Sequence, residues 1–154
     1  SPNLPEQKAA MKPFRLLLAL AVVAATQAFA QDAPPRVEVF KSASCSCCGG
    51  WVEHLRDNGF AVSTHDIEDV SAKRAQLGMP EKFGSCHTAT VKGYVIEGHV
   101  PAADIKRLLK EKPQALGLAV PGMPASSPGM GGSPVPYDSL LVDSKGSSRV
   151  FAKH

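Results

Sequence analysis

The chain has 154 residues, of which 44% are hydrophobic, and a formal net charge of +3 at pH 7. Three basic residues and one acidic residue lie within residues 1–30, so residues 31–154 carry 14 basic and 13 acidic residues. This near-neutral balance argues against binding to nucleic acid or to an anionic membrane surface, and the length is that of one domain with its own core.

Residues 11–30 are expected to be a secretory signal peptide. A short basic segment, Met11–Arg15, precedes an unbroken apolar run, Leu16–Ala25, and Ala28–Ala30 is an A-x-A cleavage signal. The apolar run of about ten residues is roughly half of what a membrane span needs. We therefore expect an exported protein that is cleaved after Ala30 and has no membrane span in its mature form. Residues 1–10 precede Met11, the expected initiator, and are left out of the fold prediction.

Residues 31–112 are expected to follow the order β-α-β-α-β-β-α. Short runs rich in β-branched and aromatic residues predict strands, and amphipathic stretches bounded by capping residues predict helices. The first helix, for example, carries Trp51, Val52 and Leu55 on one face and ends at Asn58-Gly59. The predicted strands are 37–40, 60–65, 88–91 and 94–97, and the predicted helices are 49–58, 66–77 and 101–110.

Residues 113–154 are expected to form a C-terminal extension. Gly, Pro and Ser dominate from 114 to 136, which predicts irregular structure. Segments 137–142 and 149–152 could form a final pair of strands. The extension does not have the pattern of a second domain.

The whole pattern predicts an α/β fold: a thioredoxin-like single domain with a mixed central sheet flanked by helices. A strand that runs straight into a cysteine pair at a helix N-terminus, with a hairpin and a helix later in the chain, is typical of this core.

Cys45, Cys47 and Cys48 lie within four residues, in a chain predicted for an oxidising compartment where cysteines are normally paired, metallated or catalytic. Cys45 and Cys48 have C-x-x-C spacing at the start of a predicted helix, where unsatisfied N–H groups stabilise thiolates. Thiolate is both the nucleophile of disulfide exchange and a ligand for soft metals. A dithiol oxidoreductase has no use for Cys47, whereas a site for Cu(I), Zn(II) or a cadmium-like ion does.

Cys86 and His87 occupy the loop before the third predicted strand, which in a thioredoxin-like core faces the N-terminus of the first helix. Thioredoxins usually carry a cis-proline there, which guides the substrate backbone. Its replacement weakens the prediction of a general disulfide exchanger and favours a closed cluster of four sulfurs. The alternatives for Cys86 are a buried core thiol or a disulfide with one of the other three cysteines.

Two methionines and two histidines are secondary candidates for the site. Met123 and Met130 offer thioethers, which suit copper in an oxidising compartment. Both lie in Pro-Gly-Met contexts with no apolar periodicity, so packing gives little reason for methionine there. His87 and His99 could each ligate a metal, cap a helix or lie at the surface. Among the other residues considered, Trp51 and Met79 are expected in the core, and His54, His65 and His154 in solvent.

The chain resembles the CopG-type periplasmic copper-resistance proteins of Gram-negative bacteria, which are recognised by their C-x-C-C motif. The resemblance spans roughly residues 36–131, and the matching segments are 41–51, 85–88, 97–102, 120–124 and 127–130. It implies a thioredoxin-like domain whose C-terminal extension helps to bind metal, and copper resistance through interconversion of Cu(I) and Cu(II) ahead of efflux. It also implies a multinuclear copper cluster that is bridged by four thiolates, those of Cys45, Cys47, Cys48 and Cys86. If the protein is an enzyme, the same four cysteines are its expected catalytic residues. The candidates for the remaining ligands are Met123, Met130, His99 and His87.

Two other functions remain open. The first is a thiol–disulfide oxidoreductase without stable metal, and the second is a structural zinc module. Adjacent Cys47 and Cys48 fit zinc poorly, since zinc ribbons space their ligands at C-x-x-C from both ends. These residues suit a copper-binding protein and a copper oxidoreductase equally. We expect a monomer whose partners are copper ions and periplasmic copper efflux or chaperone proteins, without nucleic acid.

Overall fold

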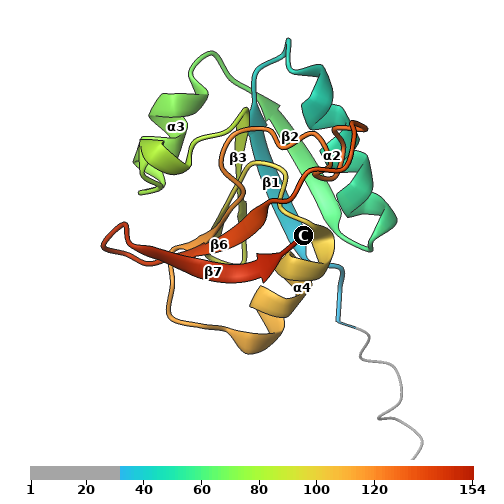
Figure 1. The fold of residues 1–154 in the computed structure, drawn as a ribbon. Helices are drawn as coiled ribbons and strands as arrows, with labels where there is room; N and C mark the ends of the chain where they lie inside the picture. The colour runs from blue at the N-terminus through green and yellow to red at the C-terminus, as the bar shows by residue number, and fades with distance from the viewer. Residues whose placement is uncertain (1–31) are drawn as a thin grey trace, which may run out of the picture. The chain divides into compact units, whose positions relative to one another are not determined.

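A seven-stranded mixed sheet runs through residues 32–154, the part of the chain that the computed structural model describes (Figure 1). The strand order is β2-β1-β3-β4-β5-β6-β7. β1 pairs in parallel with β2 and antiparallel with β3, and β3 and β4 form an antiparallel hairpin. The predicted thioredoxin-like α/β domain is confirmed. The predicted signal peptide and the residues before it lie outside the described part.

The elements follow one another in the predicted order. The strands are β1 (Arg36–Lys41), β2 (Ala61–Asp66), β3 (His87–Val91), β4 (Tyr94–Glu97), β5 (Gly117–Ala119), β6 (Asp138–Val142) and β7 (Ser148–Lys153). The helices are α2 (Ser46–Asp57), α3 (Val70–Gln76) and α4 (Ala102–Glu111), with a 3-10 turn, η2 (Glu81–Phe83), between α3 and β3.

The two faces of the sheet carry separate apolar clusters. The larger one joins α2 and α4 to the sheet, and Leu55 and Ile105 are fully buried in it together with Ile96. The smaller one surrounds Met79 and includes Val95. Neighbouring residues of a strand point to opposite faces, so Val95 and Ile96 of β4 anchor the two layers. The expected core positions of Trp51 and Met79 are confirmed.

β5 corrects the prediction that residues 114–136 are irregular throughout. Its three residues are buried, pair in parallel with β4 and antiparallel with β6, and so join the C-terminal strands to the main sheet. Gly117 is required because a Cβ there would collide with the Val95 carbonyl of the neighbouring strand. The run is too short to show a period, and Gly and Pro on both sides conceal it. From 120 to 137 the chain has no helix or strand, as predicted.

Two helices begin at other residues than predicted. α2 starts at Ser46 instead of Gly49, with Cys45 as its N-cap, so that Cys47 and Cys48 lie in its first turn. α3 starts at Val70 instead of Asp66, because the Asp69 carboxylate caps it by accepting the Ala72 N–H at 2.8 Å. Asp66, Glu68 and Asp69, which the predicted bounds include in this helix, therefore precede it.

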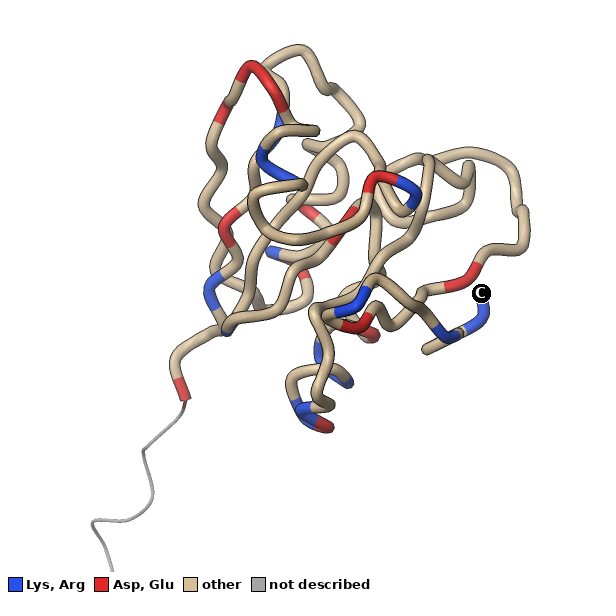
Figure 2. Tube along the Cα trace, turned by 90° about the vertical axis from the view of Figure 1, so that its left-hand side faces the viewer, with Lys and Arg blue, Asp and Glu red and all other residues tan. Residues whose placement is uncertain are grey.

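Charged residues of both signs are interspersed along the trace (Figure 2). Within residues 32–154, no helix is long and apolar enough to cross a membrane.

Candidate metal site

The four cysteines meet where two neighbouring interior strands of the sheet end and begin, at the C-terminal end of β1 and the N-terminal end of β3. β1 leads directly into Cys45 and α2, and Cys86 directly precedes β3. Because β1 and β3 are antiparallel neighbours with Lys41 opposite His87, the end of one strand lies beside the start of the other. The predicted meeting of Cys86 with the C-x-C-C run follows from this register.

The sulfur atoms form a contiguous group. Cys47 Sγ lies 3.6 Å from Cys45 Sγ and 3.9 Å from Cys86 Sγ, and Cys48 Sγ lies 3.7 Å from Cys86 Sγ. Cys45 and Cys48 form a disulfide, whereas Cys47 and Cys86 are free thiols. The alternative that Cys86 forms a disulfide with one of the other three cysteines is therefore wrong, because the disulfide joins Cys45 and Cys48.

Cys86 also belongs to a second group of donors with His87 and His99. Its sulfur lies 3.2 Å from His99 Nε2 and 3.5 Å from His87 Nδ1. The Pro128 carbonyl can only accept a hydrogen bond, so His99 Nδ1, 2.7 Å away, must carry the proton. His99 Nε2 is therefore left with its lone pair directed at the Cys86 sulfur, the tautomer that a metal ligand needs.

His87 is buried without a partner for one of its nitrogens. Its ring lies between those of Trp51 and His99, with centroids 4.3 Å and 5.1 Å away. Nε2 is one of three buried side-chain polar atoms in residues 32–154 that have no hydrogen-bond partner. Burial lowers the pKa of His87 to about 3, and burial also lowers the pKa of His99, so both rings are neutral at pH 7. The surface alternative is wrong for both histidines, which are fully buried.

The electrostatics around Cys86 favour a cation. Burial raises the pKa of the Cys86 thiol to about 11; the Ser85 hydroxyl lowers this pKa and the neighbouring Cys47 raises it. Without a positive charge Cys86 remains a thiol at neutral pH. A bound metal ion would reverse this, because coordination deprotonates a thiol outright.

The two methionines lie beside glycines that touch the site. Ser85 Oγ donates to the carbonyl of Gly122, next to Met123, at 2.5 Å. Gly129, next to Met130, packs so closely on Gly50 and Trp51 in α2 that a Cβ at either glycine would collide with the other segment. Met123 is 54% exposed and Met130 is half-buried. The structure thus brings the extension to the cysteines, with one thioether at the surface.

Replacing Gly129 with alanine is expected to lower the affinity for Cu(I) by about 10- to 100-fold, the usual effect of disturbing an outer-shell partner of a metal ligand. The new Cβ would push the extension off α2 and displace the Pro128 carbonyl that orients His99. Gly131→Ala is the matched control, because Gly131 also has a positive φ but no atom within 4 Å of the added Cβ. Chelator competition on both proteins measures the difference, and equal affinities would contradict it.

Some residues near the site were not recognised in the sequence. His54, predicted in solvent, is half-buried and accepts the Ala102 N–H at the start of α4 at 3.0 Å. Arg74 and Glu97 form a buried ion pair behind Cys86. Their partners lie 23 to 48 residues away in the chain, so no local spacing reveals them. His65 and His154 are exposed, as predicted.

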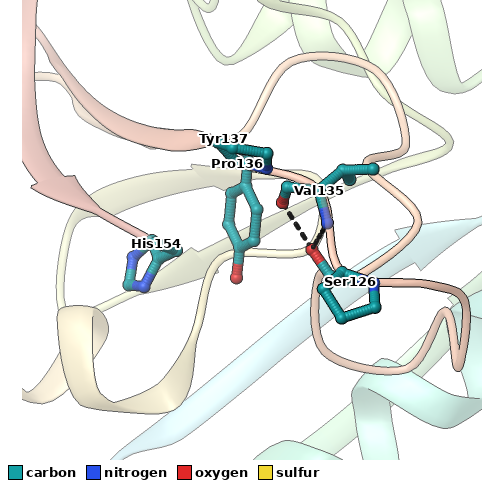
Figure 3. Close-up of a pocket in the computed structure, with 6 residues that line it drawn as sticks. Ser126, Val135, Pro136, Tyr137 and His154 are labelled. Atoms are coloured by element: carbon teal, nitrogen blue, oxygen red, sulfur yellow. Dashed lines mark hydrogen bonds between the residues drawn. The ribbon is translucent and has the colours of Figure 1, made fainter.

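An open hollow lies elsewhere on the extension, between Ser126 and the end of the chain. Figure 3 shows Pro136, Tyr137 and His154 lining it together with Val135. None of the cysteines contributes to it, so it is separate from the site.

Comparisons with known proteins agree with this geometry. A family model described as "Protein of unknown function, DUF411" matches residues 83–130, which include Cys86, His87 and His99. Two solved structures, both of copper resistance protein CopG (form 1 and form 2), are 43% identical to the chain. Each match covers 79% of this chain and 98% of the other, with a TM-score of 0.74. No curated protein matches. With this identity over nearly the whole of the solved chains, the protein belongs to the CopG family of copper resistance proteins.

Proposed function

We propose that this chain is a periplasmic protein of copper resistance that holds several copper ions in one cluster and interconverts Cu(I) and Cu(II) ahead of efflux. The observation that carries the proposal is the position of Cys86, whose sulfur belongs to a group of four cysteines and also to a group with two imidazoles. A thiolate can bridge two or more Cu(I) ions. Cys86 is thus placed to join both groups in one cluster.

The donors present fit copper. Thiolate is the ligand that Cu(I) prefers, and neutral imidazole suits both Cu(I) and Cu(II). His87 Nδ1 lies 3.5 Å from the Cys86 sulfur, and its buried Nε2 has no hydrogen-bond partner. A metal ion would coordinate one of these nitrogens. When bound, copper would supply one-electron chemistry, while Cys45, Cys47, Cys48, Cys86, His87 and His99 hold it and Trp51 screens it from water.

The extension is proposed to be part of the site. The Pro128 carbonyl accepts from His99, and the glycines next to Met123 and Met130 contact Ser85 and α2. We propose that one or both thioethers complete the coordination. We also propose a monomer that passes copper to periplasmic efflux or chaperone proteins.

Reduction of the Cys45–Cys48 disulfide is expected to be necessary for copper loading. Two electrons from an added reductant and two protons convert the bonded sulfurs into two thiols, whose protons are released to solvent when the metal binds. Anaerobic titration of reduced residues 31–154 with Cu(I) should give about two or more ions per chain, since shared thiolates hold several ions. The oxidised protein should bind less than half as much. A reduced protein that binds fewer than about two ions would overturn the cluster.

The disulfide also favours the second candidate, a thiol–disulfide oxidoreductase. Cys86 Sγ lies 3.7 Å from Cys48 Sγ. Once a base in solution has taken its proton, Cys86 can attack that sulfur, form a Cys48–Cys86 bond and release Cys45 as thiolate. A Cys47→Ser variant separates the two functions. If disulfide exchange is the function, this variant should keep full exchange activity. If copper binding in a cluster is the function, the variant should lose bound copper.

A further inference from the structure

A buried ion pair lies directly behind the cysteine site. Arg74 of α3 is 2% exposed and Glu97 at the end of β4 is fully buried. Arg74 Nε donates to Glu97 Oε1 at 2.8 Å. The remaining guanidinium nitrogens donate to Ser71 and Glu81 and to the carbonyl oxygen of Ser85.

Ser85 is held from both sides by this pair. Its carbonyl oxygen accepts from Arg74 Nη2 at 2.6 Å, and its N–H donates to Glu97 Oε1 at 2.8 Å. Its hydroxyl donates to Gly122 of the extension. Each polar group of Ser85 is therefore hydrogen-bonded to the side chain of Arg74 or Glu97 or to the extension, and none to the backbone of a neighbouring strand.

Glu97 links the two donor segments as well. Its side chain binds the backbone next to Cys86, and its own backbone leads through Gly98 to His99. One carboxylate thus sets the relation between the Cys86 sulfur and the His99 ring, which lie 3.2 Å apart.

Stability alone does not explain these charges. Removing two charges from water is costly, and a well-packed apolar pair of similar volume is often as stable or more stable than a buried ion pair. What an apolar pair cannot do is hold both the N–H and the C=O of one residue. Arginine can, because its planar fork reaches several acceptors at fixed angles.

We propose that Arg74 and Glu97 are positioning residues, which fix Ser85 so that the Cys86 sulfur reaches the other cysteines and His99 at once. This inference rests on the proposed function, because it assigns the pair a role in joining the two donor groups. It predicts that the pair decides how Cys86 is presented both with and without copper.

Three variants and one control test the pair. Arg74→Lys keeps the charge but cannot reach Glu97, Glu81 and Ser85 together. Glu97→Gln keeps the shape and removes the charge. The double variant Arg74→Met/Glu97→Leu removes both charges, so that neither is left unpaired. Glu81→Gln is the control, because Glu81 binds the same guanidinium with a side chain that is 72% exposed and does not touch Ser85.

Two measurements are made on each protein. The first is the rate at which iodoacetamide alkylates Cys86 in the reduced, metal-free protein, followed by mass spectrometry. The second is the Cu(I) affinity by chelator competition, with X-ray absorption to compare Cu–S and Cu–N coordination. We expect faster alkylation, loss of Cu–N coordination and a drop in affinity of about 10- to 100-fold in the three variants, with the control unchanged.

Folded variants that match the wild type in both measurements would overturn the positioning role. Loss of folding in all three variants, seen by circular dichroism, would also overturn it, because the pair would then be a general structural requirement. A wild-type protein that binds no copper would instead refute the proposed function. The alkylation rates would still report on the pair in that case.

Discussion

Replacing Cys86 with serine is expected to remove more bound copper than replacing any other cysteine. Cys86 is the one sulfur that belongs both to the four-cysteine group and to the group with His87 and His99. Without it, three clustered sulfurs and two imidazoles remain, with no shared atom between them. The loss of Cu(I) affinity should exceed the roughly 10- to 100-fold that is typical of an outer-shell change.

Cys45→Ser is the matched comparison. Cys45 lies across the sulfur group from Cys86, between Cys47 Sγ at 3.6 Å and its disulfide partner Cys48, and it does not belong to the group with the histidines. In the reduced protein this variant keeps the link between sulfur and imidazole and should retain part of the cluster. Anaerobic Cu(I) titration with X-ray absorption measures both the number of ions and the share of nitrogen ligands. If Cys86→Ser and Cys45→Ser bind copper equally well, the central role of Cys86 is wrong.

Local signals were sufficient for most of the fold. Alternating Val37 and Val39, the apolar face of Trp51 and Leu55, and the stop at Asn58-Gly59 each operate within a few residues, and each predicts its element correctly. β5 was missed because it is three residues long and depends on β4 and β6 for all its pairing. Tertiary context overrides local composition in such a segment.

Part of the candidate site could likewise be predicted from local sequence, and part of it depends on tertiary contacts. The C-x-C-C run shows its chemistry by spacing alone, and the fold prediction was enough to place Cys86 opposite it. The burial of His87 and His99 was not visible in the sequence, because it depends on Trp51 packing against one ring and on the Pro128 carbonyl of the extension reaching the other. The roles of Arg74 and Glu97 were also hidden, since an isolated charged residue in a sequence is normally a solvated one.

Acidification is expected to destabilise the metal-free protein strongly, with His87 as a main cause. Burial lowers the pKa of His87 from 6.5 to about 3. Above pH 6.5 the ring is neutral in both the folded and the unfolded chain, and it has no effect on the free energy of unfolding. Below pH 6.5 only the unfolded chain takes up the proton, so stability falls by about 1.4 kcal/mol per pH unit until the folded ring titrates near pH 3. The total, on the order of 5 kcal/mol, is comparable to the whole stability of a small domain.

Other buried groups act in the same pH range and must be separated from His87. The lowered pKa values of His99 and His54 add to the loss, whereas the pKa of Glu97, raised by burial, opposes it. The variant His87→Leu removes the contribution of His87 alone, together with its unpartnered Nε2 atom. Urea unfolding of the metal-free, oxidised protein between pH 7.5 and pH 4 should therefore give a shallower pH dependence for this variant. Equal slopes in His87→Leu and the wild type would show that His87 is protonated in the folded chain, which contradicts its role as a neutral buried donor.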